Sequence, residues 1–273
     1  MNNPIKQSDF SIVKSYYDES AQNEWERLDR HRNEYAVTLR ALKDHLPIPP
    51  ASILDLGGGP GRYSIALTQR GYDVSLADLS EGNLAMAKMK AAEAGVMLAD
   101  MQLANALDLH QFSDDHFDAV LLMGPLYHLT LLEERQKAVS EALRVLKPGG
   151  ILAATFISRF ALFRDGISKD PAWIFRDVEY AWHLLRTGIH DNGIGFTRSY
   201  FAHPTEVEPL FQPFDLDKIA LIGVEGVAAE NEALVNQLPE DQWEVWVEFN
   251  YTLACDVYAL GCADHLMYIG RKR

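Results

Sequence analysis

Residues 53–64 read Ile53-Leu54-Asp55-Leu56-Gly57-Gly58-Gly59-Pro60-Gly61-Arg62-Tyr63-Ser64, and the rest of the chain is organised around them. The apolar start predicts a short buried strand, and the glycines predict a turn that most side chains would block sterically. The apolar residues after Ser64 predict a helix that stops at Gly71. A strand, a glycine turn and a helix N-terminus expose backbone amides at the positive end of a helix, which predicts a cofactor site.

The spacing of the glycines indicates which cofactor binds. A dinucleotide fingerprint requires glycine at its first, third and sixth positions, and counting from Gly57 the sixth position is Arg62. The pattern is instead D-x-G-G-G-P-G, starting at Asp55. It resembles the first motif of the class I S-adenosylmethionine (SAM)-dependent methyltransferases. The resemblance implies that the cofactor is contacted by Asp55, Gly57, Gly58, Gly59, Pro60 and Gly61.

A second predicted strand, residues 73–80, carries an acid about twenty residues past the glycines. In Rossmann-type sheets an acid at this place accepts hydrogen bonds from both ribose hydroxyls, and Asp78 is the candidate. The alternative role of Asp78 is a helix cap, but Ser80 can already cap the following helix, Glu81 to Ala94. The resemblance adds Leu79 to the cofactor contacts.

The adenine site is predicted after the next strand, near Asn105 and Ala106. Relatives in the family typically have Asp-Ala here, with the acid accepting from the adenine amino group. Asn105 departs from that pattern, although its amide can accept from the amine while donating to a ring nitrogen. Asp108 is the less favoured substitute.

The fourth strand, residues 117–123, is a continuous apolar run, as expected for a parallel strand covered on both faces. It leads into Gly124-Pro125-Leu126-Tyr127-His128-Leu129, which is similar to the family's fourth motif, the wall facing the sulfonium. The resemblance therefore places Met123 and Gly124 at the cofactor. "RVLKPGG" at residues 144–150, before an apolar strand, is another hallmark of the small-molecule branch, the methyltransferase type 11-like family. The resemblance spans Ile53 to Ile157.

The predicted fold is α/β: a Rossmann-like, doubly wound, seven-stranded sheet with an antiparallel last strand. We expect one domain in four parts: an N-terminal helical cap (1–50), the SAM-binding core (51–157), a helical lid insertion (158–196) and the C-terminal part of the core sheet (197–273). Large rings in the insertion can pack as ordinary core or cover a substrate. A helix over residues 204–211, a strand over 217–224, a helix from 240 to about 260 and a last strand over 265–270 complete the expected elements, the last strand fitting an antiparallel edge.

The N-terminal cap is expected to be one long amphipathic helix from about Gln22 to Leu46. Arg32 interrupts its apolar stripe; such a guanidinium either extends to solvent or reaches an anion such as a cofactor carboxylate. Tyr16 and Tyr17 precede the helix and either pack in the core or line the cofactor and substrate pocket.

The amino-acid composition disfavours some kinds of binding partner. The chain has 273 residues, 48% of them apolar, and a formal charge of −14, which disfavours nucleic acid because Lys and Arg supply most of the affinity for phosphate backbone. Only Cys255 and Cys262 are present, so neither a disulfide framework nor a metal site is indicated. No signal peptide or membrane span is evident, and a cytoplasmic setting is expected. The sequence does not indicate an oligomeric state.

His128 is the candidate general base, because imidazole titrates near neutral pH and the residue follows the fourth strand. A histidine held only for packing or a loop hydrogen bond is the alternative. Tyr17, Tyr127, Tyr200 and His203 are candidates for the acceptor pocket. The sequence thus predicts a SAM-dependent methyltransferase acting on O or N of a small soluble acceptor. The alternatives are a nicotinamide-dependent oxidoreductase and a non-catalytic SAM-binding regulatory protein.

Overall fold

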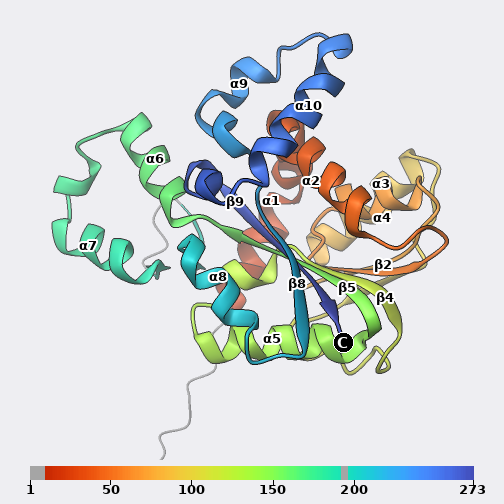
Figure 1. Ribbon diagram of the computed structural model, residues 1–273. Helices are drawn as coiled ribbons and strands as arrows, with labels where there is room; N and C mark the ends of the chain where they lie inside the picture. Colours follow the sequence, from red (N-terminus) through yellow and green to blue (C-terminus); the bar gives the residue numbers. More distant parts are fainter. Residues whose placement is uncertain (1–9, 192–195) are drawn as a thin grey trace, which may run out of the picture.

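The structure is a computed structural model that describes residues 10–191 and 196–273. Its centre is a seven-stranded sheet in the order β3-β2-β1-β4-β5-β9-β8 (Figure 1). The strands are β1 (Ser52–Leu56), β2 (Asp73–Asp78), β3 (Asp100–Leu103), β4 (Phe117–Leu122), β5 (Leu146–Ile157), β8 (Leu216–Gly223) and β9 (His265–Lys272). The first five pair in parallel, whereas β9 runs antiparallel to both β5 and β8. The predicted fold class is therefore confirmed.

The antiparallel strand lies one position inside the sheet rather than at its edge. β9 inserts between β5 and β8, with Ile157 opposite His265 and Gly223 opposite Leu266. The edge strand is thus β8, which runs in the same direction as the parallel strands because it is antiparallel to β9. This arrangement brings the start of β9 to the carboxyl end of β5, where parallel sheets of this kind hold their ligands.

Helices cover both faces of the sheet, as a doubly wound fold requires. The face that carries Leu54, Val120 and Phe156 packs against α5 (Leu132–Val145) and α8 (Pro204–Phe211). The opposite face packs against α2 (Arg32–His45), α3 (Arg62–Thr68), α4 (Glu81–Glu93) and α10 (Glu240–Ala254). Each face therefore has its own apolar core, and the strands between them are buried on both sides.

The expectation of one long N-terminal helix is wrong. α1 spans Ser11–Arg30 and α2 starts at Arg32, with a break at His31, whose φ of −107° and ψ of 54° are not helical. Tyr16 and Tyr17 lie inside α1 instead of preceding the helix. The break lets α1 cross toward α4 while α2 packs along α10. Packing of α1 and α2 against different helices therefore outweighs the continuous apolar stripe that predicted a single helix.

Other boundaries follow the local signals closely. Ser80 caps α4, its side chain accepting from Asn83 N, as predicted. α8 starts at Pro204, as predicted, and α10 starts at Glu240 but ends at Ala254. A 3₁₀ segment, η4 (Val257–Cys262), follows because the Asp256 side chain accepts from Tyr258 N and starts a new turn.

The insertion after β5 is helical, as expected. It contains α6 (Arg159–Lys169), η2 (Trp173–Phe175) and α7 (Val178–Thr187), followed by the short strands β6 (Ile189–His190) and β7 (Ser199–Tyr200). Its helices project from the side of the sheet in Figure 1. The expected insertion also includes residues 192–195, which lie outside the described residues. Within the described part of the chain, no helix is both long and apolar enough to cross a bilayer.

Candidate functional site

A cleft opens where β1, β2 and β4 end, at the carboxyl edge of the sheet. The glycine turn forms its floor, with positive φ at Gly57 (75°) and Gly59 (57°). The loop after β4 lies so close that a Cβ built on Gly124 would stand 2.7 Å from the carbonyl oxygen of Gly57. Only glycine allows this contact, so the two loops together shape the cleft.

Most of the predicted cofactor residues line this one cleft. They are Asp55, Gly57, Gly58, Gly59, Pro60, Asp78, Leu79, Asn105, Ala106, Met123 and Gly124. The acceptor candidates Tyr17 and Tyr127 and the candidate base His128 line it as well. Residues from the loops after four strands, from Asp55 to His128, thus meet at one edge of the sheet, as the strand order requires.

Asp78 holds the glycine turn in place. Its Oδ2 accepts from Gly59 N at 2.8 Å, and its Oδ1 accepts from Ser80 N at 2.8 Å and from Asn83 Nδ2 at 3.3 Å. Burial raises the pKa of its carboxyl group, while the backbone donors oppose that rise. The carboxylate therefore shapes the turn and faces the cleft at the same time.

Asp55 is fully buried at the end of β1. Its Oδ2 accepts from Ser64 Oγ at 2.6 Å, whereas its Oδ1 has no hydrogen-bond partner among the described residues. Burial raises the pKa of this carboxyl group to about 6. Because a buried oxygen without a hydrogen-bond partner is costly, Oδ1 is available to accept a hydrogen bond from a ligand in the cleft.

Asn105 follows β3 and lines the cleft. Its Oδ1 accepts from Leu107 N at 3.0 Å, which closes a local turn. Its amide N–H groups keep their donor capacity toward the cleft. Asp108, the alternative, does not line the cleft; its side chain is 68% exposed and pairs with His110.

The inner face of α1 covers the cleft, which the sequence analysis missed. Six residues near or in this helix line it: Phe10, Val13, Tyr17, Glu24, Arg27 and Leu28. Most of these residues follow one another at steps of three, four or seven, which places them on one helical face. The periodicity of residues 10–28 could therefore have revealed this covering helix. The prediction of a helix starting only at Gln22 hid this signal.

Tyr17 and His128 form a hydrogen-bonded pair inside the cleft. The Tyr17 hydroxyl lies 2.8 Å from His128 Nε2, and His128 Nδ1 lies 3.2 Å from the carbonyl oxygen of Arg198. A carbonyl oxygen only accepts, so Nδ1 carries the proton and Nε2 accepts from the tyrosine. Burial lowers the pKa of His128 to about 4, and the ring is neutral at physiological pH.

Arg27 brings a buried guanidinium to the cleft wall. It donates to both carboxylate oxygens of Glu34, at 2.6 and 2.9 Å, across the break between α1 and α2. Burial alone would raise the pKa of Glu34, but Arg27 and His265 lower it to about 2. The bidentate pair ties the cover helix α1 to α2.

Several predicted site residues lie elsewhere. Arg32 stacks on Trp243, with its guanidinium carbon 3.8 Å from the ring centroid, and pairs with Glu240. Gly61 caps α3 and faces Ala87 rather than the cleft.

The remaining candidates do not line the cleft. Tyr16 is 37% exposed and touches Tyr17 edge to face. Tyr200 donates to Glu206 at 2.7 Å beneath the guanidinium of Arg135. His203 caps α8. The structure does not bring these three side chains to the cofactor cleft.

Comparisons with known proteins agree with this geometry. A family model described as a methyltransferase domain matches residues 54–154. A ubiquinone biosynthesis O-methyltransferase of Hahella chejuensis is 25% identical over 227 residues, which is 81% of this chain and 87% of that protein. A glycine/sarcosine N-methyltransferase of Parasynechococcus marenigrum is 36% identical over 186 residues, 63% of each protein.

A solved structure has the same fold. The magnesium protoporphyrin IX methyltransferase of Synechocystis, with S-adenosylhomocysteine (SAH) bound, superposes with a TM-score of 0.60 at 14% identity over 97% of this chain and 100% of that one. The glycine turn, the acids at the ends of β1 and β2, and the family model matched over residues 54–154 together identify this part of the chain as a methyltransferase domain of the class I SAM-dependent kind, in an enzyme that uses SAM.

Proposed function

We propose that this enzyme transfers the methyl group of SAM to an oxygen or nitrogen of a small soluble acceptor by in-line displacement. The observation that carries the proposal is the single cleft lined by the glycine turn, Asp55 and Asp78 under the cover of α1. The names of the relatives, an O-methyltransferase and an N-methyltransferase of small molecules, support the choice of acceptor atoms. Bound SAM supplies an electrophilic methyl carbon on a positive sulfur.

The residues that line the cleft suggest where each part of the cofactor binds. We assign the ribose hydroxyls to Asp78, whose buried oxygens already accept from Gly59 and Ser80 and have remaining lone pairs. The orphaned Oδ1 of Asp55 suits the α-ammonium group of the cofactor. The donor amide of Asn105 and the backbone around Ala106 suit the adenine edge.

Arg27 takes the role that the sequence suggested for Arg32. Its guanidinium lies on the cleft wall, 3.6 Å from Glu24 and paired with Glu34. Arg62 also lines the cleft, but it pairs with Asp29. A cation there favours the carboxylate end of the cofactor electrostatically. Glu24 also lines the cleft, and burial raises the pKa of its carboxyl group.

The surroundings of His128 fit a residue held by hydrogen bonds better than they fit a general base. Both ring nitrogens are engaged, and a pKa of about 4 leaves little driving force to take a proton at neutral pH. We therefore propose that His128 positions the Tyr17 hydroxyl at the acceptor. Catalysis then rests mainly on alignment of acceptor, methyl carbon and sulfur, and on exclusion of water.

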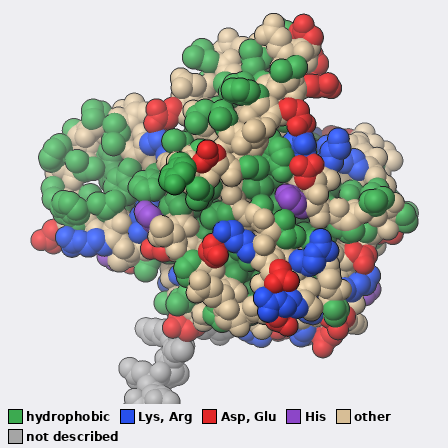
Figure 2. Space-filling view, viewed as in Figure 1, with side chains coloured by type: hydrophobic (Ala, Val, Ile, Leu, Met, Phe, Trp, Pro, Cys, Tyr) green, Lys and Arg blue, Asp and Glu red, His purple; other side chains and the backbone are tan. Residues whose placement is uncertain are grey.

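The insertion is proposed to act as a lid over the acceptor. Figure 2 shows apolar side chains gathered over α6 and α7. Exposed large side chains there are Ile167, Phe175, Val178, Trp182 and Leu185. No described residue of 158–191 lines the cofactor cleft, so this segment serves the acceptor rather than SAM. The four-part organisation expected from the sequence, with the cap over SAM and the lid over the acceptor, is part of this proposal.

A ligand-binding experiment tests the proposal. Thermal unfolding is followed with SAM, SAH, NAD and NADP, because a ligand that binds only the native state raises the melting temperature by mass action. SAM and SAH should stabilise the protein, whereas NAD and NADP should not. Turnover is then tested by SAH release with oxygen and nitrogen acceptors. Stabilisation by SAM without turnover of any acceptor would favour a non-catalytic SAM-binding protein, and stabilisation by NAD alone would favour an oxidoreductase.

A further inference from the structure

A second hollow of about 880 Å³ lies beside the cofactor cleft. It is bounded by α6, by η3 (Gly226–Asn231) and by the start of β9. Ile157 pairs with His265 across the sheet, which places the hollow at the carboxyl end of β5. The ring of Phe196, on its wall, lies 5.8 Å from the ring of His128, on the cleft wall. The volume suits a small-molecule ligand, and the contact between these two rings is where the wall of the hollow meets the wall of the cleft.

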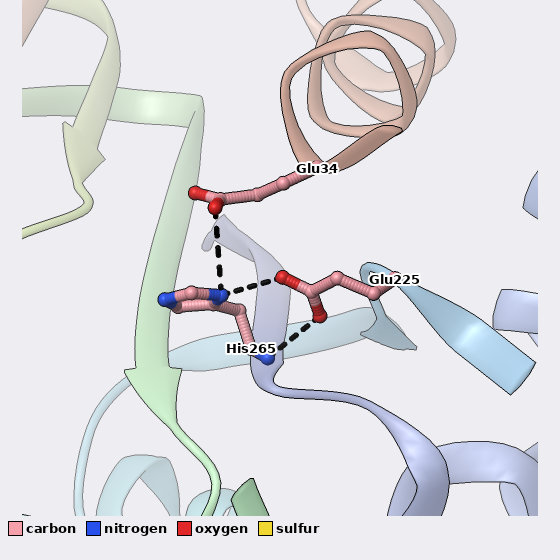
Figure 3. Close-up of side chains that lie close together, drawn as sticks. All are labelled: Glu34, Glu225 and His265. Carbon is pink, nitrogen blue, oxygen red and sulfur yellow. Dashed lines mark hydrogen bonds and ion pairs between the residues drawn. The ribbon is translucent and has the colours of Figure 1, made fainter. Parts of the chain in front are cut away.

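Two histidines line this hollow, and a glutamate backs each of them. His265 Nδ1 lies 2.5 Å from Glu225 Oε1, and His31 Nδ1 lies 2.6 Å from Glu232 Oε2. An ionised carboxylate only accepts, so each Nδ1 carries a proton. Neither Nε2 has a hydrogen bond to any residue that the structure describes. Figure 3 shows the second ring nitrogen of His265 turned away from both neighbouring glutamates.

The glutamate behind His265 is held rigidly. Glu225 is 2% exposed, and its Oε2 accepts from the backbone N–H groups of Asp264 and His265, at 2.9 and 2.8 Å. Glu34 lies on the other side, with Oε2 3.8 Å from His265 Nδ1. These contacts fix the ring, so its free edge keeps one orientation toward the hollow.

Charge keeps this ring protonated. Burial alone would lower the pKa of His265, and Arg27 on α1 opposes its charge, but Glu34 on α2 and Glu225 raise the pKa to about 9. The hydrogen bond from Glu232 likewise raises the pKa of His31. The other charged groups on the wall are paired with one another or with a neighbour: Arg164 on α6 pairs with Asp264 and lies 3.9 Å from Glu230 of η3, and Asp165 on α6 pairs with Lys169. At neutral pH Nε2 of His265 is therefore a donor.

A metal ion fits the same cluster poorly. Ligand atoms of Glu34, Glu225 and His265 lie within 4.8 Å of one another. However, both oxygens of Glu34 accept from Arg27, and one oxygen of Glu225 accepts from two backbone N–H groups. A divalent cation would have to displace the guanidinium and the Nδ1 proton. The donor set favours a protonated imidazole instead.

We propose that the hollow binds the methyl acceptor and that His265, with His31 beside it, holds an anionic group of that acceptor, a carboxylate or a phenolate. The inference rests on the proposed methyltransferase function and names its substrate class. The Nε2–H group of His265 donates to the anion, and the apolar wall around Phe196 and Phe201 covers the rest of the molecule. Acceptors that lack an acidic group are then poor ligands.

Direct binding to the SAH-loaded protein tests this proposal, with benzoate as the probe and benzyl alcohol as its neutral counterpart. Benzoate should bind at least about tenfold more tightly, because hydrogen bonds to a charged group are the stronger ones. Its affinity should fall as pH rises through about 9, where Nε2 of His265 loses its proton. His265→Gln should abolish both the preference and the fall.

The matched control is His110→Gln, since this histidine is 81% exposed and lies on another loop. Glu225→Gln should move the fall in benzoate affinity toward lower pH. Equal affinity for both probes, no benzoate binding at millimolar concentration, or an unchanged His265→Gln protein would overturn the inference. If His265→Gln fails to fold, the wild-type protein still tests the inference. A benzoate affinity that does not fall near pH 9 would reject it. Failure of SAH itself to bind would instead reject the proposed function.

Discussion

The hydroxyl of Tyr17 on the cover helix lies 2.8 Å from Nε2 of His128 in the loop after β4, and 111 positions separate them in the chain. This contact ties α1 to the wall of the cofactor cleft. It also uses the only free lone pair of the imidazole, because Nδ1–H donates to the carbonyl oxygen of Arg198. The pair therefore decides what His128 can do.

For His128 we expect His128→Gln to keep much of the turnover, because an amide can both accept from Tyr17 and donate to the Arg198 carbonyl. His128→Ala should lose roughly 1–3 kcal/mol of stability, since it leaves two buried partners unpaired. Turnover against pH and thermal unfolding measure the two effects. A loss of about a hundredfold or more in both variants, together with loss of an ionisation near neutral pH, would restore the general-base role.

Asp78→Ala should weaken SAM binding on the order of tenfold to a hundredfold, because charge-assisted bonds to the ribose are lost. It should also lower the melting temperature without ligand, since Gly59 N and Ser80 N lose their acceptor. Calorimetric titration with SAM and SAH measures the affinity. Asp108→Ala is the control, because that carboxylate is exposed outside the cleft. Equal effects of the two substitutions would contradict the ribose assignment.

Gly124→Ala adds only a methyl group, but we expect it to disrupt the cleft. The new methyl group would stand 2.7 Å from the backbone oxygen of Gly57, which cannot rotate away as a side chain can. Gly149→Ala offers a useful comparison: its φ of 77° strains alanine, but no neighbour lies within 4 Å. SAM affinity should fall strongly in the first protein only. Comparable SAM affinity in both proteins would show that contact between the two loops is unimportant.

Stability should depend on pH through the buried ion pairs. The pKa of Glu34 is lowered from 4.5 to about 2, so its stabilisation is full above pH 4.5 and is lost as pH falls toward 2. The pKa of His265 is raised from 6.5 to about 9, so its contribution is full below pH 6.5 and is lost as pH rises through 9. Each contribution is on the order of 2–3 kcal/mol. Urea unfolding across this range should show losses at both ends.

Two variants separate these contributions. Glu34→Gln should remove most of the acid loss and part of the alkaline one, because the same carboxylate supports His265. His265→Gln should remove the alkaline loss and reduce the acid one, because the charged imidazole also lowers the pKa of Glu34. An alkaline loss that survives His265→Gln would assign it to other groups.

Shortening the insertion should separate binding from transfer. Replacing residues 170–187 by a short glycine–serine linker should leave SAM affinity within about twofold, because no described residue of that segment lines the cofactor cleft. Turnover of an identified acceptor should be lost, since the lid no longer excludes water. Retained turnover would reject the lid, and a large loss of SAM affinity would show that the segment supports the cleft.

The local sequence determined the parts of this protein that depend on near neighbours. The glycine turn, the cap at Ser80, the acid at the end of β2 and the apolar parallel strands follow from steric and periodic rules that act over a few residues. Because such strands align their carboxyl ends, these rules also placed most of the cofactor residues in one cleft.

Only the tertiary structure decided the chemistry of the buried polar groups. Whether Arg27 or Arg32 faces the cleft depends on the break at His31, which packing against α4 and α10 imposes. The pKa values of His128 and His265 move in opposite directions, to about 4 and about 9. The first is buried beside a hydroxyl and a carbonyl, and the second beside two carboxylates. These neighbours come from distant segments of the chain, so the local sequence around each histidine does not predict them.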